Sequence, residues 1–149
     1  MLDAITKSAV INTDIDSLWQ AITDHKQFGD WFMVALDGPF IEGELSHGQM
    51  TLAGYEHYKW ISKVLHIQPQ KRFAFYWSPA MDMEDIDFSL RPQTLVEFKL
   101  EPQKQGVKLT VIESGFSEME DALVREEAMQ RNAEGWEIQL KNIEAYVNR

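Results

Sequence analysis

The sequence contains no cysteine, few basic residues and no long hydrophobic run. The absence of cysteine excludes disulfides, thiolate nucleophiles and cysteine-ligated metals, and with them zinc fingers, iron–sulfur clusters and papain-like catalysis. No apolar run approaches the roughly 20 residues needed to cross a bilayer. The first residues also lack the basic stretch, apolar core and cleavage site of a signal peptide. We therefore expect a cytoplasmic location and no membrane insertion.

The charge balance is strongly acidic. Lys and Arg number 14 against 24 Asp and Glu, which gives a formal net charge of -10. Such a chain repels phosphate backbones and anionic lipid headgroups, so nucleic acid is not an expected partner. The 149 residues are 44% hydrophobic and 11% aromatic. This length and composition predict one packed domain over residues 1–149.

The N-terminal third predicts a strand followed by two short helices. Residues 5–11 (ITKSAVI) form a β-prone run. Thr13 followed by Asp16 resembles a capping box, and the apolar residues from position 15 to 22 recur at helical spacing. A second cluster of aromatics at positions 28–32 predicts one more brief helical turn.

The middle of the chain alternates with period two, which is typical of strands. Residues 73–77, 94–100 and 107–112 each place apolar side chains on one face. Gly54 divides an earlier β-prone segment as a hairpin would, and residues 103–106 predict a second turn. Together these signals predict a meander of about six strands.

The last third predicts a long amphipathic helix. Ser117 with Glu120 resembles a capping box, and an apolar stripe from Met129 to Val147 recurs every three or four residues. Gly135 lies within this helix, where glycine costs about 1 kcal/mol relative to alanine. We therefore expect the helix backbone to approach another element closely at this point.

These elements predict an α+β fold in which a curved antiparallel sheet of six or seven strands wraps round the C-terminal helix. One helix fills such a sheet only in part, which predicts a ligand-sized cavity of roughly a few hundred Å³ between them. The segment between Trp77 and Gln93 is acidic yet rich in apolar residues, and we expect it to fold over the cavity as a lid.

Four segments carry a family resemblance: VINTDIDSLWQAITDHKQFGDWF, VLHIQPQKRFAFYW, TLVEFKLEPQKQGVKLTVIESGF and GWEIQLKNIEAYV. The chain resembles the activator of heat-shock-protein-90 ATPase homologue-like family, within the START and birch-pollen-allergen-like (SRPBCC) superfamily. The resemblance implies a START-like helix-grip fold and a cavity for lipids, hormones, polyketides or other apolar molecules. A few superfamily branches are cyclases, aromatases or dehydratases. The eukaryotic namesake stimulates a chaperone ATPase, which implies a role in the stress response.

The candidate site is defined by aromatic and apolar residues on the expected inner face. A bound molecule would be held there mainly by burial, and a few polar groups would orient it. By strand position, the candidate polar groups are Tyr58, Tyr76, Arg91 and Glu113. The expected cavity-lining residues are Trp60, Phe73, Phe75, Trp77, Val96, Phe98 and Trp136.

No residue pattern indicates a metal, a cofactor or a catalytic group. His25, His47, His57 and His66 lack metal-ligand spacing. The acidic cluster within residues 82–87 lacks the glycine and terminal glutamate of a calcium loop. No serine has a nucleophile-elbow setting. The leading hypothesis is non-enzymatic binding of an apolar small molecule; the alternatives are an interaction module for a chaperone or another protein, and a cyclase- or dehydratase-type enzyme.

Overall fold

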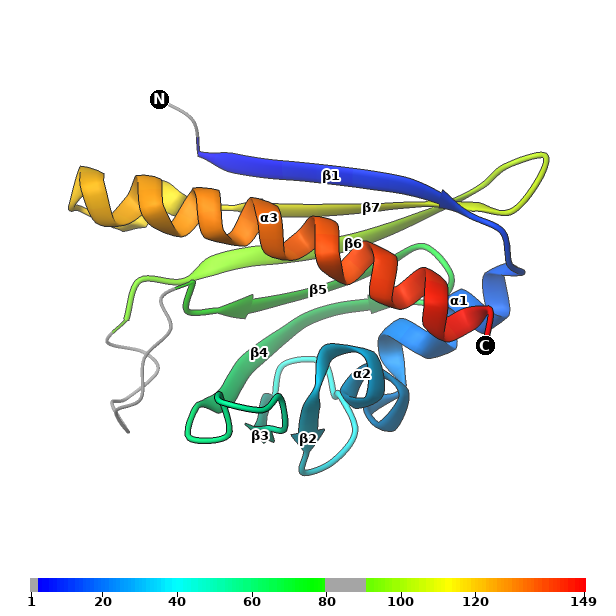
Figure 1. The fold of residues 1–149 in the computed structure, drawn as a ribbon, viewed down its shortest axis with the longest axis horizontal. Coiled ribbons are helices and arrows are strands. Elements are labelled where there is room, and N and C mark those ends of the chain that lie inside the picture. Colours follow the sequence, from blue (N-terminus) through cyan, green and yellow to red (C-terminus); the bar gives the residue numbers. More distant parts are fainter. Residues whose placement is uncertain (1–2, 80–90) are drawn as a thin grey trace.

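The computed structural model describes residues 3–79 and 91–149, which form a seven-stranded antiparallel sheet and three α-helices. A long C-terminal helix lies across one face of the sheet, and the two short helices lie at one end of it (Figure 1). The elements in chain order are β1 (Ala4–Ile11), α1 (Ile15–Thr23), α2 (His25–Phe32), β2 (Val34–Leu36), β3 (Leu45–Met50), β4 (Lys59–Gln68), β5 (Arg72–Trp77), β6 (Thr94–Pro102), β7 (Val107–Ser114), a 3₁₀ turn (Phe116–Glu118) and α3 (Ala122–Val147).

The sheet order is β1-β7-β6-β5-β4-β3-β2, and each neighbouring pair is antiparallel. The first strand therefore pairs with the last, while the remaining strands follow as a meander. The register between β4 and β5 shifts between Val64 and His66. Such an irregularity bends a strand, which helps the sheet to curve round α3. This is the helix-grip fold that the sequence predicts.

Strand alternation sets the inner face of the sheet, on the side of α3. Phe73 and Phe75 of β5 are fully buried, as are Val96 and Phe98 of β6. Leu109 of β7 is also fully buried. The predicted alternation is confirmed in β6 and β7, where buried residues fall on every second position; in β5 the small Ala74, on the opposite face, is buried as well. From the helix side, the apolar stripe buries Trp136, Leu140 and Ile143.

The helix starts differ from the predicted capping boxes. The cap of α3 is Asp121, whose carboxylate accepts the backbone N–H groups of Leu123 and Val124. The expected box at Ser117 is therefore wrong: Gly115 adopts a φ of 95°, and the chain then makes a 3₁₀ turn. The cap of α1 is Asp14 rather than Thr13. In both cases an aspartate further along the chain, one residue after Thr13 and four residues after Ser117, takes the role of the cap.

Gly135 shows no close approach to another element. A Cβ built at this position meets no atom of another element within 4 Å, so the expected packing reason for the glycine is wrong. Gly106 is the contrasting case: its φ is 91°, and a Cβ there would lie 2.2 Å from the carbonyl oxygen of Ile11. The glycine is required in the β6–β7 turn and not in the helix.

The expected lid falls mostly on residues 80–90, which lie outside the described residues. In the described part of the chain, no helix is both long and apolar enough to span a membrane.

We predict that Gly135→Ala stabilises the protein by up to about 1 kcal/mol, because alanine loses less backbone entropy in a helix and meets open space here. Urea unfolding followed by circular dichroism measures the change. The matched variant Gly106→Ala should lower stability by more than this gain. Destabilisation by Gly135→Ala would mean that the glycine has a role in packing after all.

Candidate functional site

Aromatic side chains cover the inner face beneath α3. Trp77 of β5 stacks on Trp136 of α3 with ring centroids 5.6 Å apart, and Phe98 meets Trp136 edge-on at 5.7 Å. Phe32 of α2 contacts Trp60 of β4 at 5.1 Å. The seven predicted residues therefore share one face, and α2 adds further rings to it. All seven are buried except Trp77, which is only partly covered: Trp60, Phe73, Phe75, Trp77, Val96, Phe98 and Trp136.

Glu113 of β7 lies on this face with no solvent exposure. The indole N–H groups of Trp77 and Trp136 donate to its two carboxylate oxygens, at 2.8 Å to Oε2 and 2.9 Å to Oε1. The hydroxyl of Thr94 donates to Oε2 at 2.6 Å, and the amide of Asn132 reaches both oxygens at 3.1 and 3.2 Å. The side chain is thus bound from β5, β6 and α3 at once.

The donors around Glu113 define its chemistry. Indole and amide N–H groups can only donate, so both oxygens act as acceptors, as expected for an ionised carboxylate. No Lys or Arg of the described residues forms a salt bridge with it. The hydrogen bonds must therefore offset the cost of burying the charge. A carboxylate held in this way is suited to fixing neighbouring groups in place.

Two partners of Glu113 were not identified from the sequence, although signals for them exist. Asn132 precedes Trp136 by four residues and so interrupts the apolar stripe of the helix with a polar group. Thr94 begins the buried alternation of β6 and is itself 1% exposed. In both cases the signal is a polar residue at a position where the sequence pattern predicts a core residue.

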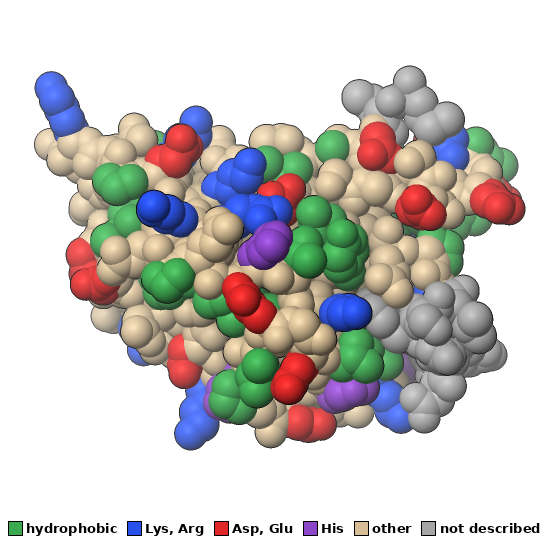
Figure 2. Space-filling view, turned by 180° about the vertical axis from the view of Figure 1, so that it is seen from behind, with side chains coloured by type: hydrophobic (Ala, Val, Ile, Leu, Met, Phe, Trp, Pro, Cys, Tyr) green, Lys and Arg blue, Asp and Glu red, His purple; other side chains and the backbone are tan. Residues whose placement is uncertain are grey.

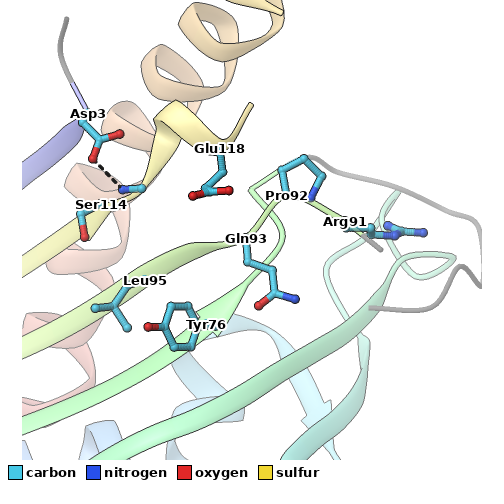
Figure 3. Close-up of a pocket in the computed structure, with 9 residues that line it drawn as sticks. Asp3, Tyr76, Arg91, Pro92, Gln93, Leu95, Ser114 and Glu118 are labelled. Carbon is cyan, nitrogen blue, oxygen red and sulfur yellow. Dashed lines mark hydrogen bonds between the residues drawn. The ribbon is translucent and has the colours of Figure 1, made fainter. Parts of the chain in front are cut away.

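The other polar candidates lie elsewhere. Alternation along β5 places Tyr76 on the outer face, opposite to Phe75 and Trp77. Tyr76 and Arg91 there line an open depression of about 530 Å³. Figure 3 shows Asp3 and Glu118 at one end of this depression and Arg91 at the other. The expectation that Tyr76 and Arg91 face the interior is therefore wrong.

Tyr58 also lies away from the aromatic face. It precedes β4 in the loop after β3, where its ring lies 5.9 Å from that of Tyr55 and 4.4 Å from that of His57. The turn in this loop, and not strand alternation, sets the position of the side chain. Glu113 is thus the one polar candidate that joins the predicted aromatic set.

The described residues contain no group of three or more His, Asp or Glu side chains that could hold a metal ion. The acidic cluster at residues 82–87 lies outside the described part of the chain.

We predict that Glu113→Gln lowers the free energy of unfolding by about 3 kcal/mol, because glutamine replaces one acceptor with a donor and leaves buried N–H groups unpaired. Urea unfolding measures the loss. Glu101→Gln, on the exposed end of β6, serves as the control and should change stability by less than about 0.5 kcal/mol. Equal effects of the two variants would contradict a tethering role for Glu113.

Comparison with solved structures supports the fold. The chain is similar to DynU16, a protein of the dynemicin biosynthetic locus, with a TM-score of 0.77 and 19% sequence identity. The matched region covers 99% of this chain but only 48% of DynU16. Protein MLL2253 from Mesorhizobium loti gives a TM-score of 0.76 and 20% identity, covering 98% and 97% of the two chains. CalU16 from Micromonospora echinospora gives a TM-score of 0.66 and 18% identity, and the matched region covers 97% of this chain and 75% of CalU16.

None of the curated proteins compared with the chain matches it. The model of one family, described as activator of Hsp90 ATPase homolog 1-like protein, matches residues 12–148. That match extends from the end of β1 to the end of α3 and so includes the aromatic face and Glu113. The chain belongs to the activator of Hsp90 ATPase homolog 1-like family.

Proposed function

We propose that the protein binds an apolar or aromatic small molecule between the sheet and α3, without catalysing a reaction on it. The observation that carries this proposal is the aromatic face, which ends at a polar group. Its rings supply apolar contact area, and Glu113 with its donors fixes the rings at one end. One similar structure, DynU16, is that of a protein of the dynemicin biosynthetic locus, which is consistent with a ligand of this kind.

The Trp77 end of the face is where we place the ligand. Phe28, Phe73, Phe75 and Phe98 are fully buried and pack ring against ring, so the far end is solid core. Trp77 is only partly covered although its neighbours on the same face are buried. A ligand that stacks on Trp77 extends the aromatic face without opening the core.

The enzyme alternative finds less support in the geometry. Glu113 is the buried carboxylate at the site, and both of its oxygens already accept hydrogen bonds from protein donors. A general acid or base needs an oxygen within reach of a substrate proton. The saturated environment of Glu113 instead favours a positioning role.

The interaction-module alternative requires a broad apolar surface. Figure 2 shows the face of the molecule opposite to α3, where hydrophobic side chains lie among charged and polar ones and do not form one continuous area. Surfaces that bind protein partners through burial usually expose several hundred Å² of contiguous apolar area. This face therefore gives that alternative no specific support.

A thermal-shift screen tests the proposal with sterols, flavonoids, fatty acids and polyketide-like aromatics. A ligand that binds the folded state raises the unfolding free energy by about 2.7 kcal/mol at 100 times its Kd. We expect a rise in the melting temperature together with quenching of tryptophan fluorescence, because Trp77 would contact the ligand. Failure of every compound in both measurements would contradict the proposal and favour the interaction module.

A matched pair of variants tests whether the ligand binds on the inner face of the sheet. Val96 and Leu95 are neighbours on β6, with Val96 on the inner face and Leu95 on the outer one. Val96→Phe takes up interior volume and should weaken binding, whereas Leu95→Phe should leave the affinity unchanged. Circular dichroism confirms that each variant is folded before it is compared. Weaker binding in Leu95→Phe alone would move the site to the outer depression.

A further inference from the structure

A row of polar side chains crosses the inner face at the Trp77 end. Ser46 of β3 lies directly opposite Ser62 of β4, and Ser62 lies opposite Trp77 of β5. Trp77 in turn lies opposite Thr94 of β6, which bonds to Glu113. Side chains that face one another across antiparallel strands are neighbours, so the row is continuous from β3 to β7.

The β3 end of this row is short of hydrogen-bond partners. Ser46 is 6% exposed, and its hydroxyl oxygen has no hydrogen-bond partner among residues 3–79 and 91–149. Ser62 is fully buried and accepts one bond from the indole N–H of Trp60 at 3.2 Å. A hydroxyl has one donor and two acceptor positions, so this bond occupies only one acceptor position of Ser62. Buried polar groups are nearly always paired, and an unpaired one calls for an explanation, of which a bound molecule is one.

The other end of the row is saturated and negative. The carboxylate of Glu113 accepts bonds from four side chains and forms no salt bridge with a described Lys or Arg. The serine end, by contrast, consists of neutral hydroxyls. A ligand carboxylate buried beside Ser46 and Ser62 would carry a desolvation cost that two hydroxyls do not offset, so the polar end of a ligand that lies along the row is uncharged.

Given the proposed function, we infer that the ligand is a neutral molecule with an apolar or aromatic body and one hydroxyl or carbonyl group, which bonds to Ser46 and Ser62. The row orients the molecule: its polar end meets the two serines, and its body lies against Trp77. Carboxylate ligands such as fatty acids are disfavoured, because two serine hydroxyls do not offset the cost of burying a charge.

Three probes of one shape test this inference on the full chain: naphthalene, 2-naphthol and 2-naphthoate. Titration followed by tryptophan fluorescence gives the three dissociation constants. We expect 2-naphthol to bind at least about tenfold more tightly than 2-naphthoate, and several-fold more tightly than naphthalene. Ser46→Ala should weaken the binding of 2-naphthol by about fivefold and leave the binding of naphthalene unchanged. The variant should fold, because it removes a hydroxyl that forms no hydrogen bond with the described part of the chain.

Ser114→Ala is the matched control, since Ser114 follows Glu113 on β7 but lines the outer depression; it should alter none of the three constants. If neither naphthalene nor 2-naphthol binds, the proposed function fails. If both bind with equal affinity and Ser46→Ala changes neither, the function stands and the inference of a serine subsite is overturned. Tight binding of 2-naphthoate would overturn the rejection of carboxylates.

Discussion

The carboxylate of Glu113 is the constraint on which the arrangement of sheet and helix depends. Buried without a described salt-bridge partner, it must be compensated by hydrogen bonds, and it receives them from β5, β6 and α3. Asn132 and Trp136 lie four residues apart and therefore on one side of the helix. Their simultaneous bonds to one carboxylate fix both the rotation of α3 and its position along the sheet, which apolar packing alone leaves less well defined.

This constraint divides the space under α3 into two chemically different ends. At one end, Phe28 packs edge-on against Phe40 and Phe75, and side chains fill the interior. At the other end, Trp77 and Trp136 are stacked and their indole N–H groups are committed to Glu113. Two large rings are thus held rigid by polar bonds at their edges while their faces remain apolar. Rigid apolar faces beside fixed polar groups are the usual composition of small-molecule sites.

The sequence predicted what depends on local periodicity and missed what depends on contacts between distant residues. Alternation in β5, β6 and β7 and the stripe of α3 were sufficient for the fold and for the aromatic face. Asn132 interrupts the apolar stripe of the helix, which marks it as unusual, but the sequence does not indicate that its partner is Glu113, nineteen residues earlier. Tyr76 was included among the polar candidates although the alternation of its own strand places it on the face opposite to Phe75 and Trp77, where the structure has it. Gly135 shows the same limit: its surroundings, and not its own identity, decide whether it is required.

The identity of the ligand has to be argued from the side chains of this chain, because the similar structures reported above share only 18 to 20% of its sequence. At that distance the backbone fold is kept while the residues lining the interior are free to differ. In the helix-grip fold, apolar side chains give affinity to any hydrophobic molecule of suitable size, and so discriminate poorly between ligands. Polar groups discriminate well, because a mismatched ligand leaves them unpaired or faces a like charge. Under the proposed function, ligand specificity therefore rests on the few polar positions among the aromatics, from Ser46 to Glu113.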